Sequence, residues 1–135
     1  MARVYGALAR EVAQHGLPYQ PPVALISGGE TTVTVRGRGR GGRNVEFLLA
    51  LAEDLDGAAG IFALACDTDG IDGSEDNAGA VLAPDSLKRA GKKKLDAAKM
   101  LDDNDGYGFF SALGDLVVTG PTRTNVNDFR VILVQ

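Results

Sequence analysis

Two short apolar runs constrain the fold of this chain more than any other feature of its sequence. Residues 23–26 and 61–66 contain only aliphatic, aromatic and thiol side chains, and each run is followed at once by a polar stretch that contains glycine. A continuous apolar run of this length is typical of a strand that is buried on both faces, because a half-exposed strand alternates and a buried helix is longer. We therefore expect both runs to be strands of a central sheet.

Helical periodicity surrounds these two runs. Apolar side chains recur every four residues from Val4 to Val12, which predicts an amphipathic helix that ends near Gly16. A second apolar stripe over residues 47–55 predicts another helix, with Asn44 as its N-terminal cap. Further helices are expected at residues 86–90, 94–101 and 107–113.

The remaining strands set the fold class. Residues 31–36 alternate in part between valine and polar side chains, which predicts a second, more exposed strand. Two more strands are expected at residues 116–118 and 129–134. Strands that alternate with helices indicate an α/β domain, and the short step between residues 26 and 31 favours some antiparallel pairing. We predict a single domain over residues 1–135, of three-layer α/β/α architecture with a mixed β-sheet.

Charge, hydropathy and cysteine content narrow the class of protein. The net charge of −4 argues against a nucleic-acid-binding protein. No apolar run approaches the roughly 20 residues that span a bilayer, and residues 1–10 lack the apolar core of a signal peptide. Cys66 is the only cysteine and cannot form an internal disulfide, which favours a reducing compartment. We expect a cytoplasmic protein that binds neither nucleic acid nor membrane.

The glycine-rich polar loops all follow expected strands. They comprise residues 27–30, 37–43, 67–73 and 119–128. In α/β folds ligands bind beyond the carboxyl ends of strands. The sequence therefore predicts a binding site formed by these loops together.

The loop of residues 37–44 (GRGRGGRN) combines four glycines and three arginines just before a helix. Glycine lets backbone N–H groups approach an anion, and arginine donates paired hydrogen bonds to phosphate or carboxylate, so we predict anion binding. A flexible solvated loop is the alternative. The loop also matches the dinucleotide pattern G-x-G-x-x-G, but the acidic residues about 20 positions later, Asp54 and Asp56, fall at a helix end. No Walker A string is present, which excludes the usual P-loop kinase.

Asp67, Asp69 and Asp72 lie in a tight turn after the second apolar run. Carboxylate oxygens suit Mg²⁺, so these three residues are the candidate metal ligands. A calcium-binding EF-hand does not fit, because its fifth and twelfth positions would be Ile71 and Ala78. The alternative is that Asp67 and Asp72 organise the turn through backbone hydrogen bonds.

Other candidates for chemistry are few. The loop of residues 119–128 is dense in hydroxyls and amides, which serve equally well as turn residues. His15 is the only histidine, so this chain cannot form a histidine-based triad or a histidine-rich zinc site.

Several of these strings together resemble the MOFRL domain of class II glycerate 2-kinases. The strings are residues 25–33 (LISGGETTV), 39–46 (GRGGRNVE), 68–73 (TDGIDG), 107–110 (YGFF) and 113–128. The resemblance runs from about the first helix to the C-terminus and is loose only over the lysine-rich residues 87–103. It implies transfer of the γ-phosphoryl group of ATP to the 2-hydroxyl of D-glycerate, with Mg²⁺. It also implies a larger N-terminal kinase domain as partner, with the active site between the two domains and a catalytic lysine outside this chain.

The resemblance also assigns site residues. Arg43 and Asp69 become the candidate catalytic residues. The residues expected to bind substrate or phosphate are Ser27, Gly28, Gly29, Glu30, Gly41, Gly42, Asn44, Thr119, Thr122, Asn125 and Asn127. Two other functions stay open, namely a nicotinamide-dependent hydroxypyruvate reductase domain and a stand-alone ligand-binding domain without catalysis.

Overall fold

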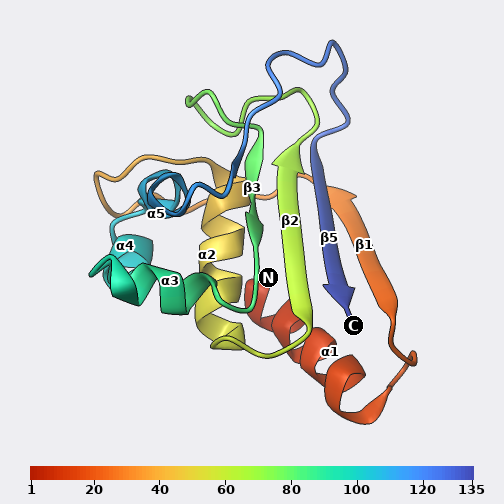
Figure 1. The fold of residues 1–135 in the computed structure, drawn as a ribbon. Helices are drawn as coiled ribbons and strands as arrows, with labels where there is room; N and C mark the ends of the chain where they lie inside the picture. The colour runs from red at the N-terminus through yellow and green to blue at the C-terminus, as the bar shows by residue number, and fades with distance from the viewer.

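The computed structural model describes all of residues 1–135 and contains five helices and five strands (Figure 1). In chain order the elements are α1 (Ala2–His15), β1 (Val23–Gly29), α2 (Arg43–Leu55), β2 (Ile61–Asp67), β3 (Gly79–Leu82), α3 (Ser86–Lys92), α4 (Ala97–Asp102), α5 (Gly106–Leu113), β4 (Leu116–Val117) and β5 (Asp128–Val134). The strands expected from the two apolar runs and the helix expected after Met1 are confirmed. Gly16 ends α1 in the left-handed conformation, with φ of 63°.

The strands form one sheet in the order β1-β5-β2-β3-β4, and every pair of neighbouring strands is antiparallel. The sheet is therefore antiparallel, and our prediction of a mixed sheet is wrong. The reason is long-range: β5, from the C-terminal end of the chain, inserts between β1 and β2 and runs against both. Figure 1 shows the consequence for the site, because β1 and β2 end, and β5 begins, at the same end of the sheet.

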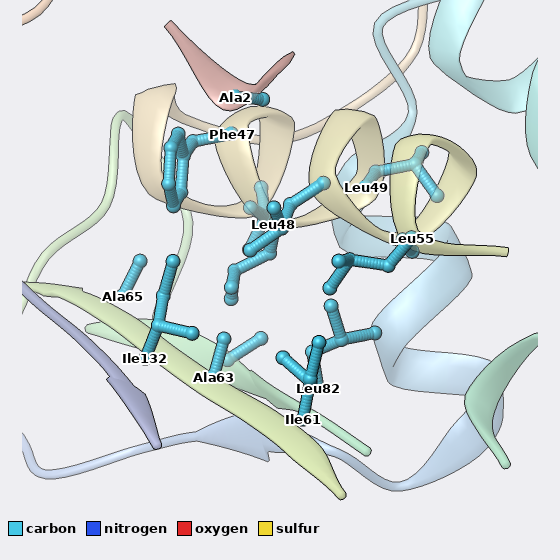
Figure 2. Close-up of a cluster of buried hydrophobic side chains, with 14 of the residues drawn as sticks. Ala2, Phe47, Leu48, Leu49, Leu55, Ile61, Ala63, Ala65, Leu82 and Ile132 are labelled. Carbon is cyan, nitrogen blue, oxygen red and sulfur yellow. The ribbon is translucent and has the colours of Figure 1, made fainter. Parts of the chain in front are cut away.

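One hydrophobic core joins the helices to one face of the sheet. Alternate residues of β2, namely Ile61, Ala63 and Ala65, are buried beneath α2, as Figure 2 shows. The residues between them are only partly buried, and on the same open face Phe129 of β5 is 42% exposed. The helices that pack through this core cover one face of the sheet, so β2 is not buried on both faces as we expected. The apolar side chains on the open face of the sheet misled the prediction, because they imitate a strand buried on both sides.

The connection between β1 and α2, residues 30–42, does not contain the strand that we expected at residues 31–36. Its backbone amides bond elsewhere: the N–H groups of Arg36 and Gly37 both donate to Oδ1 of Asn104, at 2.7 and 2.8 Å. Asn104 lies between α4 and α5, so the 30–42 connection crosses to that turn. It does not pair with β1, whose neighbour in the sheet is β5. No helix in the structure is long and apolar enough to cross a membrane.

Candidate functional site

A cleft of about 420 Å³ lies at the end of the sheet where β1 and β2 terminate. It is lined by Thr31, Val33, Val35, Gly39, Gly41, Gly42, Arg43, Glu46, Asp67, Asp69, Ile71, Gly73 and Asn104. Arg43 and Asp69 therefore line one cleft, as we expected, although the strand expected before the Arg43 loop does not form. A larger hollow of about 620 Å³ adjoins the cleft along the 30–42 connection. Arg43 lines both the cleft and the hollow, and Glu30 lines the hollow.

Arg43 is the first residue of α2, and three carboxylates surround its guanidinium group. Its Nε donates to Oδ1 of Asp128 at 2.7 Å, and its Nη2 to Oδ2 of Asp67 at 2.8 Å. Its Nη1 lies 3.2 Å from Oε1 of Glu30, whose side chain is 65% exposed. Although partial burial opposes the charge, hydrogen bonding to Asp128 and the charges of Asp128 and Asp67 raise the pKa of Arg43. The group is a permanent cation in the wall of the cleft.

Asp128 is the partner of Arg43 that the sequence analysis did not predict. Its side chain is fully buried at the start of β5 and also accepts hydrogen bonds from Nδ2 of Asn44 at 3.0 Å and Nη2 of Arg130 at 2.5 Å. A signal was present in the sequence. Residues 128, 130, 132 and 134 face the core in turn, and the first two are charged, which a buried strand face accepts only as a pair.

Asp72 caps the N-terminus of α2 from inside the protein. Its Oδ1 accepts from the backbone N–H of Asn44 at 3.0 Å and its Oδ2 from that of Val45 at 2.9 Å, and the residue is fully buried. Burial raises the pKa of Asp72 against the lowering effect of these hydrogen bonds. The expected capping role of Asn44 is therefore wrong, because Asn44 is a buried helical residue that bonds Asp72 and Asp128 instead. The amides predicted to bind an external anion already bind a carboxylate.

The glycine–arginine loop, residues 37–43, is held by hydrogen bonds and an ion pair to other parts of the chain. The backbone N–H groups of Arg38 and Arg40 donate to carboxylates of Asp103 and Asp105 at 2.9 and 3.2 Å. The guanidinium of Arg40 pairs with Glu75 at 2.5 Å and lies over the ring of Tyr107. A solvated, flexible loop is therefore not what the structure contains. Arg43 is the arginine of this loop that lines the cleft.

Gly42 explains why two glycines precede Arg43. A Cβ atom at Gly42 would collide with the carboxylate of Asp72, so only glycine lets the cap approach the helix. Gly41 has φ of 144°, a conformation that other residues rarely adopt. Both glycines line the cleft. Gly42 serves the packing of α2 against Asp72, and a Cβ atom at Gly41 would meet Val45 of α2 and the backbone of Tyr107 in α5.

The three carboxylates predicted as metal ligands are not gathered into one group in this structure. No group of three or more Asp, Glu, His or Cys side chains is arranged to hold a metal ion. Asp72 is turned inward to cap α2, and Asp67 pairs with Arg43. Asp67 and Asp69 both line the cleft, but of the two only Asp69 forms no ion pair, and its Oδ1 accepts from the backbone N–H of Ile71 at 2.9 Å. The alternative interpretation was that Asp67 and Asp72 organise the turn through backbone hydrogen bonds. Asp67 does so, because its Oδ1 accepts from the backbone N–H of Asp69 at 3.2 Å, whereas the backbone bonds of Asp72 go to α2.

The remaining predicted residues, apart from Glu30, are not among those that line the cleft or the adjoining hollow. The polar loop before β5 packs on the acidic loop, residues 67–76, at the end of β2. Thr122 donates to the carbonyl oxygen of Thr68, and Nδ2 of Asn125 lies 3.5 Å from Oδ2 of Asp69. The carbonyl oxygen of Asn127 accepts from both the backbone N–H and the hydroxyl of Thr68. Thr119 bonds only to its neighbour Gly120.

Ser27, Gly28 and Gly29 belong to β1, where they pair with Arg130, Phe129 and Asp128 of β5. A Cβ atom at Gly28 would lie 3.2 Å from the carbonyl oxygen of Asp128, so glycine lets the two strands approach at this end of the sheet. These three residues therefore support the position of Asp128, and Glu30, which follows them, reaches the hollow itself.

The fold and the cleft define a class of protein: an α/β domain that presents, at one end of an antiparallel sheet, an arginine held between buried carboxylates. The chain belongs to the MOFRL family, whose sequence model matches residues 23–128. The matched stretch runs from the start of β1 to the first residue of β5. It contains all but the last residue of the Arg43 cluster, which comprises Arg43, Asn44, Asp67, Asp72, Asp128 and Arg130.

Named relatives are longer than this chain. It is 54% identical over 136 residues to an Agrobacterium vitis protein provisionally named hydroxypyruvate reductase, covering 99% of this chain and 31% of the relative. It is 38% identical over 130 residues to the glycerate 2-kinase of Pyrococcus horikoshii, covering 96% of this chain and 29% of the relative. The chain thus spans less than a third of the length of these relatives.

A solved structure shares the fold. The crystal structure of glycerate kinase from Thermotoga maritima matches with a TM-score of 0.96 at 39% sequence identity, covering 99% of this chain and 32% of that chain. Nearly the whole of the present fold, the 30–42 connection included, therefore has a counterpart in that kinase.

Proposed function

We propose that this chain is the C-terminal domain of a glycerate 2-kinase, which transfers the γ-phosphoryl group of ATP to the 2-hydroxyl of D-glycerate. The products are 2-phosphoglycerate and ADP. The observation that carries the proposal is the match to the Thermotoga maritima glycerate kinase over 99% of this chain, with a TM-score of 0.96. At 39% identity such a match supports a common activity as well as a common fold.

Arg43 is the residue of this chain to which we assign charge stabilisation. Phosphoryl transfer depends mainly on positioning and on stabilising negative charge, and an arginine supplies both. Its Nε and Nη2 are held by Asp128 and Asp67, so Nη1 is the group that remains for an anionic substrate. The exposed carboxylate of Glu30 occupies that position and can give way to a ligand, because exposed ion pairs contribute little stability.

Asp69 is the acidic residue that we assign to the glycerate hydroxyl. Its carboxylate faces the same cleft as Arg43, and it is the one of the three predicted carboxylates not committed to α2 or Arg43. The reaction also requires Mg²⁺ with ATP. The carboxylates of this chain do not fit a metal site, so no step assigned to its residues uses the metal.

The remaining groups belong to another domain in this proposal. The relatives are about three times as long as the stretch that they share with this chain, which leaves room for a second domain that closes the cleft and supplies a catalytic lysine. We therefore expect the isolated 135-residue chain to be inactive.

A nicotinamide-dependent hydroxypyruvate reductase is the alternative that the name of the Agrobacterium relative raises. The geometry of the G-x-G-x-x-G loop opposes it. In dinucleotide-binding folds the loop joins parallel strands, and the pyrophosphate lies on free amides at the helix N-terminus. Here the sheet is antiparallel, and the Asp72 carboxylate occupies those amides of α2.

A chimaeric enzyme tests the proposal. The matching third of the Thermotoga maritima kinase is replaced by this chain, and ADP formation is measured with ATP and D-glycerate. We expect glycerate-dependent ADP formation, lowered roughly 10³-fold or more by Arg43→Ala and only partly restored by Arg43→Lys. Arg89→Ala is the matched control, since Arg89 also forms two ion pairs but lies away from the cleft. A folded chimaera that makes no ADP, or that instead oxidises NADH with hydroxypyruvate, refutes the proposal.

A further inference from the structure

The orientation of the Arg43 side chain is fixed from one edge. Nε and Nη2 form the same edge of the planar guanidinium group, and that edge faces the two buried carboxylates of Asp128 and Asp67. The side chains of these carboxylates are 0% and 8% exposed, whereas that of Glu30, at the opposite nitrogen, is 65% exposed. The buried contacts of the guanidinium are therefore made by Nε and Nη2, and Nη1 is the nitrogen on its exposed side.

Asp128 makes the more complete set of contacts of the two. A carboxylate has about four acceptor positions. Those of Asp128 receive Arg43 and Asn44 on Oδ1, and Arg130 and the hydroxyl of Thr31 on Oδ2. Because donors from β5, α2 and the 30–42 connection converge on it, this carboxylate cannot rotate without breaking several hydrogen bonds at once.

Arg130 is a second cation that pairs with Asp128. Its side chain is 2% exposed, and its Nη2 lies 2.5 Å from Oδ2 of Asp128. The guanidinium of Arg130 also lies over the ring of Phe47, 5.4 Å from its centroid. The buried charge of Asp128 is thereby balanced without Arg43. Asp128 can therefore orient Arg43 through Nε, while the charge of Arg43 faces Asp67 and, on the exposed side, Glu30, whose place an anion in the cleft can take.

We propose that Asp128 is a positioning residue of the catalytic site: with Arg130 as its counter-charge, it holds the guanidinium of Arg43 in the orientation that the transferring phosphoryl group requires. This inference rests on the proposed kinase function. Asp128 acts through Arg43 and touches no substrate. Its removal should therefore lower kcat by misplacing Arg43, and a misplacement of about 1 Å costs on the order of 100-fold in rate.

The first test needs no enzymatic activity. Proton exchange of the Arg43 Nε–H group is measured by NMR in the 135-residue chain, with the exposed Arg38 as internal reference. We expect exchange at Arg43 to be at least about tenfold slower than at Arg38, because a buried hydrogen bond must open first. Equal exchange rates in the unmodified chain overturn the proposal, whether or not any variant folds.

The second test compares Asp128→Asn with Asp115→Asn, which weakens the ion pair of Arg89 and so serves as matched control. In the chain, Asp128→Asn should accelerate exchange at Arg43, and the control should not. In the chimaeric kinase, Asp128→Asn should lower kcat about 100-fold while the KM for glycerate changes much less.

Two results contradict the positioning role. One is an Arg43 Nε–H that stays protected in folded Asp128→Asn, and the other is a kcat in that variant equal to that of the control. A merely structural Asp128 would lower the melting temperature and leave both quantities unchanged. If the unmodified chimaera makes no ADP, the kinase proposal fails, and the exchange data alone then decide whether Asp128 positions Arg43.

Discussion

Replacing Arg43 with alanine should destabilise this chain far more than an exposed substitution would. Loop composition alone would favour a small effect, because Arg43 ends a glycine-rich stretch that could be a solvated loop. In the structure the side chain is 22% exposed, and its removal takes away the cation that faces Asp67 and one of the two that face Asp128.

The contacts set the magnitude. Removing one partner of a fully buried ion pair costs about 3–5 kcal/mol, because the remaining charge is left uncompensated. Two features reduce the cost here: Asp128 keeps Arg130 and Asn44, and water can reach the space that Arg43 leaves. We therefore expect a loss of about 2–3 kcal/mol, which for a domain of this size lowers the melting temperature by roughly 10 °C.

Thermal and urea unfolding of four chains measures this effect: unmodified, Arg43→Ala, Arg89→Ala and Arg38→Ala. Arg89 pairs with Asp115 and Asp85, and its side chain is 32% exposed, so its loss should cost about 1 kcal/mol and shrink in about 1 M salt. The exposed Arg38 should matter by less than about 0.5 kcal/mol. An Arg43→Ala chain as stable as Arg38→Ala would refute the reasoning, since it would mean that Asp67 and Asp128 do not depend on the guanidinium.

Three further predictions concern the surroundings of the cleft. Burial, helped by the charge of Asp72, raises the pKa of Cys66 to about 11, so alkylation of this thiol should be slow at neutral pH and approach the rate of the unfolded chain only near that pH. Because the pKa of Asp72 is raised in the folded chain, its contribution to stability is fully present below the ordinary pKa of 3.8 and is lost as pH rises through the raised pKa. Asp72→Asn should therefore flatten this part of the pH dependence of the unfolding free energy. An unchanged slope would contradict the assignment. Gly42→Ala should cost about 1–3 kcal/mol through collision with Asp72, whereas Gly91→Ala in α3, where a Cβ meets nothing within 4 Å, should stabilise by about 0.5–1 kcal/mol; equal unfolding midpoints would refute the steric argument.

Local patterns predicted the elements of this fold better than their pairing. The apolar runs identified β1 and β2, and the four-residue repeat identified α1, because both patterns depend on neighbours in sequence. The alternation over residues 31–36 failed as a strand signal. A strand also needs a partner for its backbone groups, and Asn104, far away in the sequence, takes the N–H groups of Arg36 and Gly37 instead.

The candidate site was predictable in part for the same reason. Arg43 and Asp69 were expected to share a cleft because each was placed in a loop after a strand, and both do line one cleft. The strand expected before the Arg43 loop, at residues 31–36, does not form, and Arg43 is instead carried to the cleft by the 30–42 connection that follows β1. The partners of those residues were not predictable from loop composition. Asp128 lies on a strand, and its neighbour in space depends on β5 inserting between β1 and β2.

The Arg43 cluster also explains why fold and site cannot be separated in this chain. Asp128 and Asp72, two of the buried carboxylates, hold the start of α2 against the ends of β5 and the acidic loop, and the same contacts aim Arg43 and leave Asp69 at the cleft. Burying charged groups is costly unless each finds a partner, so a sequence free to optimise stability alone would place apolar residues there. The charges are retained at the end of the sheet where the cleft opens, and nowhere else in β5. We infer that the cluster is kept for the geometry it gives Arg43, and that stability lost by mutating any of its members will be accompanied by a change at the cleft.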